Sequence, residues 1–586
     1  MPRIVTLLFL LLLPTFALAA DPSSKPNILL ILTDDQGFGD LSLHGNPYVE
    51  TPFLDAMMGE SVELTHFHAA PLCAPTRASL MTGRHHLKAG VWGVHGGRDY
   101  MDLGQVTIAE RLSEAGYRTA MAGKWHLGKT APYLAYNRGF DESWVITDRL
   151  YEHADPVLDH NGVEEHRVGW TVDSLHEIAL EWISAENNRP FFFYLAHPYI
   201  HEPYYAPEDL IEKYREKGLS ESFATLCAMT EHLDESLRQF FENLKKTSLF
   251  ENTIVLFMGD NGPIGNPVNL PHLTDEEMNF RNPANLRGVK GNPYENGTRA
   301  PCFIYWNNHF SPMVSKQEVD ITDMVPTILE LAGVGFDSKE FDGVSIVNHL
   351  ENGEAIETPS RFYANHQVEW KGKERLYDFL EDKSQLEFGT QNLAIRSGNW
   401  KYVRSYGNEE LFDLKADPSE RHNLLDAHPD KASSMRAELQ TWWEEVRELE
   451  ESYEMPVFVL PERIGAETIL DTCAPQVLQG DVHQGSHFSF DWERNEDGIV
   501  FGVRVPSDGK YLVRAVVEAK GNDLVLEVGT KDSRTFAELS NGKFEVELGE
   551  LFLQEGDQNL GLHLVKAKSN PGIIKVVEKV VCTRVQ

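Results

Sequence analysis

Two long apolar runs, each ending in acidic or amide residues, stand out in the hydrophobic pattern of the chain. The first runs over 28–33 and ends in Asp34 and Asp35, and the second runs over 252–259 and ends in Asp260 and Asn261. A continuous apolar run of this length is typical of a strand buried on both faces, as in a parallel sheet. Because ligands bind at the carboxyl ends of such strands, both polar pairs are expected at one sheet edge.

Further apolar segments extend this α/β pattern. Segments 116–122 and 190–196 read as two more strands. Lys124 and His126 follow the first, and His201 follows the second. Residues 222–244 carry an apolar stripe at helical spacing, which predicts an amphipathic helix packed on the sheet. The expected fold is therefore a large, mixed, mostly parallel sheet flanked by helices.

The pattern changes twice toward the C-terminus. Segments 393–396 and 400–403 read as paired strands, followed by a helix whose apolar residues recur at spacings of three and four. This predicts a small antiparallel sheet with a helix on it. From about residue 455, short alternating strands separated by Gly, Asn and Asp turns predict a β-sandwich. We expect four parts: an N-terminal segment over residues 1–20, the α/β part over 21–370, the small sheet with its helix over 371–455, and the β-sandwich over 456–586.

The composition and the N-terminal residues limit the partners of the protein and its cellular compartment. Among the 586 residues the formal net charge is −37, which excludes nucleic acid and acidic lipid as partners of the bulk surface. Residues 1–20 combine Arg3, an apolar run and small residues, as in a secretory signal peptide. No later run is long enough for a membrane span. We therefore expect export to a periplasmic, extracellular or other secretory compartment.

The chain has five cysteines, so at least one lies outside a disulfide if the protein is exported. Cys227 and Cys302 lie in apolar patterns typical of core thiols. The sequence leaves open a disulfide between Cys473 and Cys582. Cys73 is then the odd one.

Cys73 is expected at the N-terminus of a helix. Pro75 suits the first position of a helix, and residues 78–81 can continue it. At a helix N-terminus the unpaired N–H groups and the dipole favour an anion, which predicts a lowered pKa and a nucleophilic thiol. Taken alone, the segment is more typical of a buried structural cysteine beside a helix-starting proline, since short motifs recur by chance.

The two polar strand ends predict a metal site. Asp34, Asp35, Asp260 and Asn261 offer only oxygen ligands, which suit a hard divalent cation. Ca²⁺ is expected, with Mg²⁺ as the alternative. Either pair alone would ordinarily be interpreted as a solvated acidic loop.

Several motifs resemble those of one family when they are taken together. The segment 73–84 is similar to the Cys-x-Pro-x-Arg signature of the type I sulfatases, which belong to the alkaline phosphatase superfamily. The resemblance extends over about residues 26–452 and is carried by four further segments: Gly123–Gly128, His201–Pro203, Gly288–Gly291 and Tyr294–Pro301. It implies an alkaline-phosphatase-like fold and identifies 371–455 with the C-terminal sulfatase subdomain.

The resemblance also implies a role for each matching residue. Cys73 would be converted to formylglycine (3-oxoalanine) by a formylglycine-generating enzyme, and its hydrate would be the nucleophile and a further ligand of the cation. Asp260 would assist the attack on sulfur. Lys124, Lys290 and His201 would bind the sulfuryl oxygens, and His201 or Lys290 would protonate the leaving oxygen. His126 would accept the proton of the second hydroxyl, and Arg77 would support the nucleophile and the metal.

The sequence therefore predicts an exported, arylsulfatase-like sulfuric ester hydrolase that acts on a sulfated carbohydrate. Two alternatives stay open. One is a phosphonate or phosphate ester hydrolase of the same superfamily, and the other is a non-catalytic protein that binds sulfated glycans. The last part loosely resembles the jelly-roll modules beside polysaccharide-active enzymes, and a packing domain without a ligand is the alternative.

Overall fold

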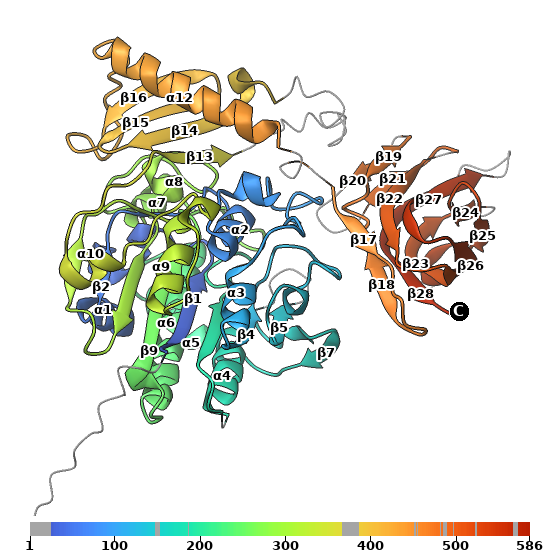
Figure 1. Cartoon of the computed structure of the whole chain (residues 1–586), viewed down its shortest axis with the longest axis horizontal. Coiled ribbons are helices and arrows are strands. Elements are labelled where there is room, and N and C mark those ends of the chain that lie inside the picture. The colour runs from blue at the N-terminus through green and yellow to red at the C-terminus, as the bar shows by residue number, and fades with distance from the viewer. Residues whose placement is uncertain are drawn as a thin grey trace, which may run out of the picture.

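The structure is a computed structural model of the chain. It describes residues 25–146, 153–185, 187–365, 386–449, 453, 455–480, 482–484, 489–495, 497–521, 524–566 and 572–586. The predicted signal peptide and the predicted boundary at residue 370 lie outside the described residues. Figure 1 shows an α/β part, a small sheet with one long helix above it, and a β-sandwich at the side.

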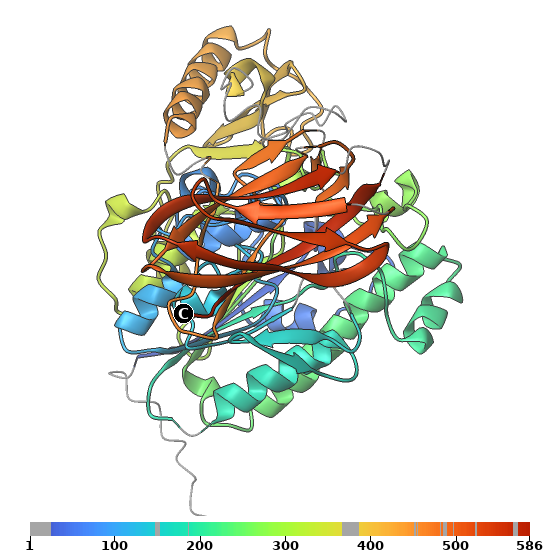
Figure 2. The ribbon, with the colours of Figure 1, turned by 90° about the vertical axis from the view of Figure 1, so that its right-hand side faces the viewer.

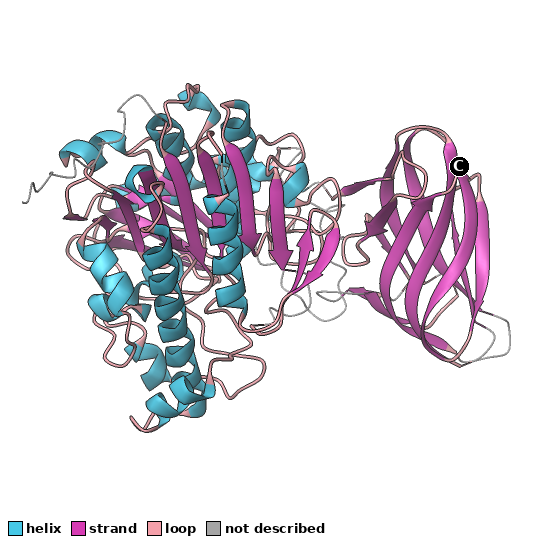
Figure 3. Ribbon diagram, turned by 90° about the horizontal axis from the view of Figure 1, so that it is seen from below, coloured by secondary structure: helices cyan, strands magenta, loops and turns pink. Residues whose placement is uncertain are grey.

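A large mixed sheet forms the centre of the α/β part, with helices on both of its faces (Figure 3). Within the described residues it has ten strands, in the order β11-β2-β10-β9-β1-β8-β4-β5-β6-β7. The five strands from β9 to β5 are parallel to one another, whereas β10 runs antiparallel to both of its neighbours, β5, β6 and β7 pair antiparallel, and β11 pairs parallel with β2. In that order the strands span Met313–Ser315, Val62–Leu64, Cys302–Trp306, Thr253–Gly259, Asn27–Thr33, Phe191–Ala196, Arg118–Gly123, Glu142–Ile146, Val157–His160 and Val163–His166.

The helices pack on the two faces because alternate residues of β1 point in opposite directions. Leu30 lies in a core shared with α2, α3 and α9, whereas Leu29 and Ile31 lie in a second core with α1, α4, α5 and α6. The prediction of a strand buried on both faces is thus confirmed. The helices are α1 Pro52–Gly59, α2 Cys73–Thr82, α3 Ile108–Glu114, α4 Thr171–Ser184, α5 Glu208–Arg215, α6 Glu221–Leu244, α7 Asp275–Phe280, α8 Glu295–Thr298, α9 Met324–Leu331 and α10 Val347–Asn352.

The strand register aligns the carboxyl ends of four neighbouring strands. Thr33 at the end of β1 pairs with Gly259 at the end of β9. Ala196 at the end of β8 pairs with Leu32 on one side and with Gly123 of β4 on the other. The residues after these four strands therefore meet at one edge of the sheet, where open α/β sheets bind ligands.

The small sheet and its helix follow the pattern expected from the sequence. Four antiparallel strands are ordered β13-β14-β15-β16 and lie under α12 (Figure 1). Trp443 and Leu439 of α12 are buried. The elements span Arg361–Asn365, Asn392–Ser397, Trp400–Ser405, Asn408–Asp413 and, for α12, Pro429–Arg447.

The C-terminal part is a sandwich of two sheets, each with six strands in the described residues. Figure 2 shows these strands from the side, in front of the α/β part. One sheet contains β17 Val457–Val459, β19 Val477–Gln479, β22 Gly498–Val505, β24 Leu524–Gly529, β25 Arg534–Leu539 and β27 Gly556–Lys566. The other contains β18 Glu467–Leu470, β20 His483–Gln484, β21 Ser489–Trp492, β23 Gly509–Lys520, β26 Gly542–Leu553 and β28 Ile573–Arg584.

All five cysteines lie in the described residues, and each is buried without a disulfide. The bond between Cys473 and Cys582 that the sequence left open is therefore not formed, and both side chains are fully buried. Within the described ranges, no helix combines the length and apolar character that a membrane span requires.

A buried ionic network joins the small sheet to the α/β part. Glu295 of α8 pairs with His68 at 2.9 Å and with Lys401 of β15 at 2.9 Å. Lys401 also lies 3.1 Å from Glu420, and it is fully buried. Two carboxylates thus share one buried ammonium group across the junction.

We expect Lys401→Met to be strongly destabilising. The change leaves two carboxylates buried beside each other with less positive charge, and breaking a buried pair in this way costs about 3–5 kcal/mol. Chemical denaturation of both proteins would measure the loss in the free energy of unfolding. Lys415→Met, at an exposed position, is the matched control and should stay within about 0.5 kcal/mol of the parent. A loss of similar size in both variants would contradict the account.

A second acid at this junction makes stability depend on pH. Burial raises the pKa of Glu318 to about 7, although Arg396, 3.3 Å away, and Arg361 oppose the shift. The folded protein therefore holds this proton at pH values where the unfolded chain has lost it. Stability should fall as the pH rises through this interval.

Glu318→Gln should remove that loss. Relative to the parent, we expect the variant to gain stability as the pH rises from about 4.5 to about 7, by roughly 1–3 kcal/mol in all. Denaturation curves of both proteins at several pH values give the difference. A difference that does not change with pH would contradict the predicted shift.

Candidate active site

Cys73 is the first residue of α2, which is buried along its whole length. The helix begins two residues earlier than the sequence suggested, so Pro75 is its third residue rather than its first. Proline fits there because N–H groups of the first turn have no partner within the helix. The first helical bond runs from Thr76 N–H to the carbonyl of Leu72, at 3.0 Å.

The predicted lowering of the thiol pKa is wrong. Burial raises the pKa of Cys73, and this effect outweighs the opposing charges of Lys124 and Lys290. An unmodified thiol at this position is therefore mostly protonated at neutral pH and a weak nucleophile.

The four predicted metal ligands meet at the aligned strand ends. The N–H of Asp35 donates to Asp260 Oδ1 at 3.1 Å, and Asn261 Nδ2 donates to Asp35 Oδ1 at 2.8 Å. All four side chains are buried. One oxygen from each of Asp34, Asp35 and Asn261 accepts no hydrogen bond, and these atoms are Asp34 Oδ1, Asp35 Oδ2 and Asn261 Oδ1.

This donor set fits a hard divalent cation. Buried carboxylate oxygens without hydrogen-bond partners are costly unless a cation neutralises them. Asp34, Asp35 and His201 also lie close enough together for one atom of each to approach a common ion. The carboxylate and amide oxygens suit Ca²⁺ or Mg²⁺ better than softer metals.

The crowded charges shift the acids in different directions. Burial favours a raised pKa for Asp34, but Lys124, His201 and Arg77 together hold it well below its ordinary value. Asp260 shows the opposite outcome, because burial and the charge of Asp34 raise its pKa to about 7.

Three basic side chains hold this set of acids in place. Lys124 forms an ion pair with Asp34, and Lys290 forms one with Asp35. Arg77 donates to Asp260 Oδ2 at 3.0 Å and lies 3.5 Å from Asp34 Oδ2. The same guanidinium donates to the carbonyl of Lys124 at 2.8 Å, so Arg77 ties α2 to two strand ends.

His201 lies at the same edge of the sheet. Its Nε2 is 3.6 Å from Asp35 Oδ2, and its Nδ1 bonds to the carbonyl of Glu202 at 2.6 Å. Because a carbonyl only accepts, Nδ1 carries a proton and Nε2 is the nitrogen directed toward the acids. His153 bonds to the carbonyl of His201 at 3.0 Å, a support that the sequence analysis missed. Burial lowers the pKa of His201, although Asp35 and Asp34 oppose the shift.

His126 has different neighbours from the other predicted residues. Its Nε2 bonds to the carbonyl of Val94 at 2.8 Å and lies 3.8 Å from Asp99 Oδ2. His95 and Asp99 are grouped with it in space. Val94, His95 and Asp99 could not be recognised from the sequence, because they belong to none of the motifs and lie about thirty residues before His126.

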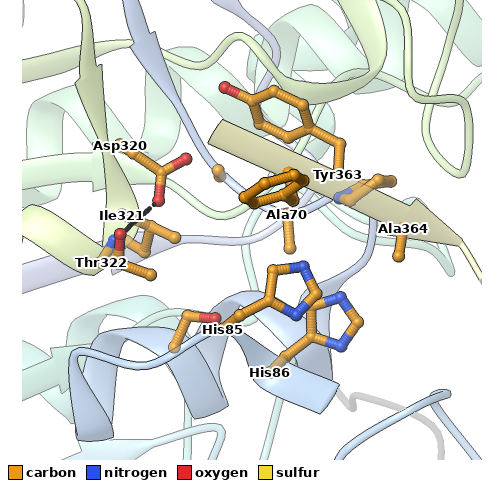
Figure 4. A pocket seen from close by; sticks show the side chains of 12 residues that line it. Ala70, His85, His86, Asp320, Ile321, Thr322, Tyr363 and Ala364 are labelled. Atoms are coloured by element: carbon orange, nitrogen blue, oxygen red, sulfur yellow. Dashed lines mark hydrogen bonds between the residues drawn. The ribbon is translucent and has the colours of Figure 1, made fainter. Parts of the chain in front are cut away.

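A small cavity lies on another side of α2 (Figure 4). It encloses about 10 Å³, enough for roughly one water molecule. Its lining includes Ser79 of α2, His85, His86, Asp320 and Tyr363, and none of the site residues described above. This cavity is too small for a substrate.

Comparison with known proteins identifies the class to which this fold and site belong. A family model described as Sulfatase matches residues 26–334, and one described as N-sulphoglucosamine sulphohydrolase, C-terminal, matches residues 290–452. Arylsulfatase J of Mus musculus is 30% identical over 472 residues, which cover 70% of this chain and 74% of that protein. N-acetylgalactosamine-6-sulfatase of the same species is 29% identical over 461 residues, with 70% and 83% covered.

A solved structure shares the fold. It is described as Ps i-CgsB in complex with k-i-k-neocarrahexaose and has a TM-score of 0.62 at 24% identity, covering 72% of this chain and 93% of that one. The class is thus that of sulfuric ester hydrolases with an alkaline-phosphatase-like fold. The chain belongs to the sulfatase family of the alkaline phosphatase superfamily. Both family models end at or before residue 452, ahead of the C-terminal sandwich.

Proposed function

We propose that this protein hydrolyses sulfate esters of a sulfated carbohydrate through a formylglycine made from Cys73, with a divalent cation. The observation that carries the proposal is the convergence of Cys73 with four buried oxygen ligands and three basic side chains at one sheet edge. Overall, water and the ester give the free alcohol and hydrogen sulfate. The sulfur–oxygen bond to the alcohol breaks, and a new sulfur–oxygen bond forms to the nucleophile.

Modification of Cys73 agrees with its surroundings. A buried thiol with a raised pKa is poorly suited to attack sulfur. The hydrate of formylglycine would supply a hydroxyl nucleophile instead. The proposal requires a formylglycine-generating enzyme as a partner during maturation.

Asp34, Asp35, Asp260 and Asn261 would hold the cation, Ca²⁺ in the first place and Mg²⁺ as the alternative. The cation would supply Lewis-acid stabilisation of negative charge on the sulfuryl group and the nucleophile. Arg77 fixes Asp260 and Asp34 relative to α2, and thereby positions residue 73 against the ligands.

The remaining residues neutralise charge and move protons. Lys124 and Lys290 lie beside the acids and would bind the sulfuryl oxygens when the cation neutralises Asp34 and Asp35. His201 presents Nε2 to the site and, when protonated, would give its proton to the departing alcohol oxygen, a task that Lys290 could share. His126 would accept the proton from the hydroxyl at position 73 when sulfate leaves.

Two observations support a carbohydrate as the substrate. One solved relative of the same fold is described with a bound neocarrahexaose, and one curated relative is named for a sulfated amino sugar. We further propose that the protein is exported, from the signal-like residues 1–20. The segments 133–170 and 264–285 are candidates for sugar recognition, because His153 of the first bonds to the carbonyl of His201 and Arg281 of the second donates to the carbonyl of Asp35.

A substrate panel tests the proposed function. Purified protein made with a formylglycine-generating enzyme would be assayed on sulfated mono- and oligosaccharides, an aryl sulfate, a phosphate monoester and a phosphonate monoester. We expect kcat/KM to be highest for one of the sulfated sugars. Higher kcat/KM for a phosphonate or phosphate would favour the related hydrolase, and binding of sulfated glycans without turnover would favour the binding protein.

A further inference from the structure

The C-terminal sandwich packs against a short stretch of the α/β part, Trp92 to Tyr100, called here the 92–100 segment. The hydroxyl of Tyr100 donates to Asp471 Oδ2 of the sandwich part at 2.9 Å. A Cβ atom on Gly97 would lie 2.5 Å from Met455 Cε and 3.1 Å from Ala474 Cβ, so Gly97 lies in close contact with the sandwich part. Trp92 and Tyr100 share one continuous core with the sandwich residues.

The same segment holds His126. The carbonyl of Val94 accepts a hydrogen bond from His126 Nε2, and the buried carboxylate of Asp99 lies 3.8 Å from that nitrogen. The N–H of Met101, just after the segment, donates to the carbonyl of Leu127 at 3.3 Å. Both the ring of His126 and the backbone next to it are therefore attached to this segment.

The 92–100 segment is also closed on itself. The N–H groups of Trp92 and Gly93 donate to the carbonyl of Arg98, at 3.0 and 3.2 Å. Arg98 Nε donates to the carbonyl of His95 at 2.7 Å. These bonds close residues 92–98 into a loop that contains Val94 and Gly97, and Asp99 and Tyr100 follow it directly.

We propose that the sandwich is a positioning element of the active site: through Tyr100 and Gly97 it fixes the 92–100 segment, whose Val94 carbonyl and Asp99 carboxylate orient His126. The inference deepens the proposed function and rests on it, because it assigns a task to the sandwich in the step that His126 performs. Val94, Asp99 and Tyr100 are positioning residues, since they act through His126.

The geometry gives this positioning a chemical consequence. The Val94 carbonyl only accepts, so His126 Nε2 carries the proton and Nδ1 keeps the lone pair that can accept another. His126 Nδ1 is buried and has no hydrogen-bond partner among the described residues. Burial, together with Lys124 and His95, keeps the pKa of His126 far below its ordinary value, so the ring is neutral and ready to accept a proton.

Asp99 then stabilises the ring once it is charged. A carboxylate beside a histidine favours the imidazolium that forms when the proton arrives. If the segment shifts, the ring loses both its fixed tautomer and this stabilisation. The expected effect is on sulfate release, the step that needs His126, rather than on alcohol release.

The test compares two variants with a matched control, using an aryl sulfate as the probe. Tyr100→Phe removes only the hydroxyl that contacts Asp471, and Asp99→Asn removes the charge beside His126. Tyr511→Phe removes a hydroxyl inside the sandwich that bonds to the carbonyl of Pro461, remote from the segment. Alcohol and sulfate are measured separately through the first turnovers, with thermal unfolding as a check on folding.

We expect kcat to fall about 10-fold in Tyr100→Phe and about 10- to 100-fold in Asp99→Asn, with KM falling by about the same factor, because kcat/KM reports only the steps up to alcohol release. Both should release a burst of about one equivalent of alcohol before sulfate appears. Tyr511→Phe should match the parent. Asp471→Asn, which changes the same contact from the sandwich side, should behave like Tyr100→Phe and replaces it if that variant does not fold.

Loss of kcat without the burst, or equal behaviour of Tyr100→Phe and Tyr511→Phe, would overturn the inference. The proposed function would survive either result, because the parent protein would still hydrolyse the sulfate ester. A parent protein carrying formylglycine that hydrolyses no sulfate ester would overturn the proposed function and the inference together.

Discussion

Cys73→Ala is expected to abolish sulfate ester hydrolysis while leaving the protein folded. The methyl group cannot become an aldehyde, so no nucleophile forms at the N-terminus of α2. Loss of a nucleophile of this kind lowers kcat by about 10⁴-fold or more. The Cys73 side chain is buried but makes no disulfide, so the change removes only a small group from the core.

The measurement is kcat/KM on the best sulfated substrate, with thermal unfolding recorded in parallel. Cys302→Ala is the matched control, because Cys302 is equally buried on β10 but lies outside the predicted site. We expect the control to lose some stability and to keep its kcat. Activity of Cys73→Ala within about tenfold of the parent would rule out residue 73 as the nucleophile.

Asp34→Asn should lose the bound cation and most of the activity. The change removes one negative charge from the proposed metal site and leaves Lys124 facing a neutral amide. Lewis-acid stabilisation by a bound cation contributes several kcal/mol, so kcat/KM should fall by about 10³-fold or more. The same loss should follow treatment of the parent with a chelator, and added Ca²⁺ or Mg²⁺ should reverse it.

Elemental analysis of the purified proteins provides the readout that does not depend on activity. The parent should carry about one divalent cation per chain, and Asp34→Asn much less than that. Asp532→Asn, at an exposed turn of the sandwich, should keep the parent's metal content. An unchanged metal content in Asp34→Asn would reject this ligand.

Much of the fold and of the candidate metal site could be predicted because the signals were local in the sequence. A run such as 28–32 is apolar at every position, which only a strand covered on both faces explains. Parallel strands then place their carboxyl ends together, so the pattern alone was enough to assign Asp34 and Asp260 to one site. The motif around Cys73 supplied the candidate nucleophile in the same way, and this role stays a prediction.

Other features could not be predicted because they depend on contacts between distant residues. The pKa of Cys73 follows from burial by the surrounding elements, which outweighs the helix N-terminus that the sequence displays. Asp99 comes near His126 only when the 92–100 segment folds back, and no spacing indicates it. The contact between Tyr100 and Asp471 joins residues 371 positions apart.

The sandwich illustrates the same limit. Its strands and turns were visible in the alternating pattern, but a pattern of this kind does not tell which surface packs against the rest of the chain. That surface is what would give the domain a part in catalysis. The sequence left open that the sandwich is a packing domain without a ligand. Such a domain can still contribute to catalysis if its packing orients His126.

The central claim is that Cys73 supplies the nucleophile only after conversion to formylglycine. The most direct measurement is the mass of the proteolytic peptide that contains residue 73, from protein that hydrolyses sulfate esters. Conversion of the thiol side chain to an aldehyde lowers the mass by about 18 units, and we expect this peptide in proportion to the activity. An unmodified Cys73 in fully active protein would contradict the account.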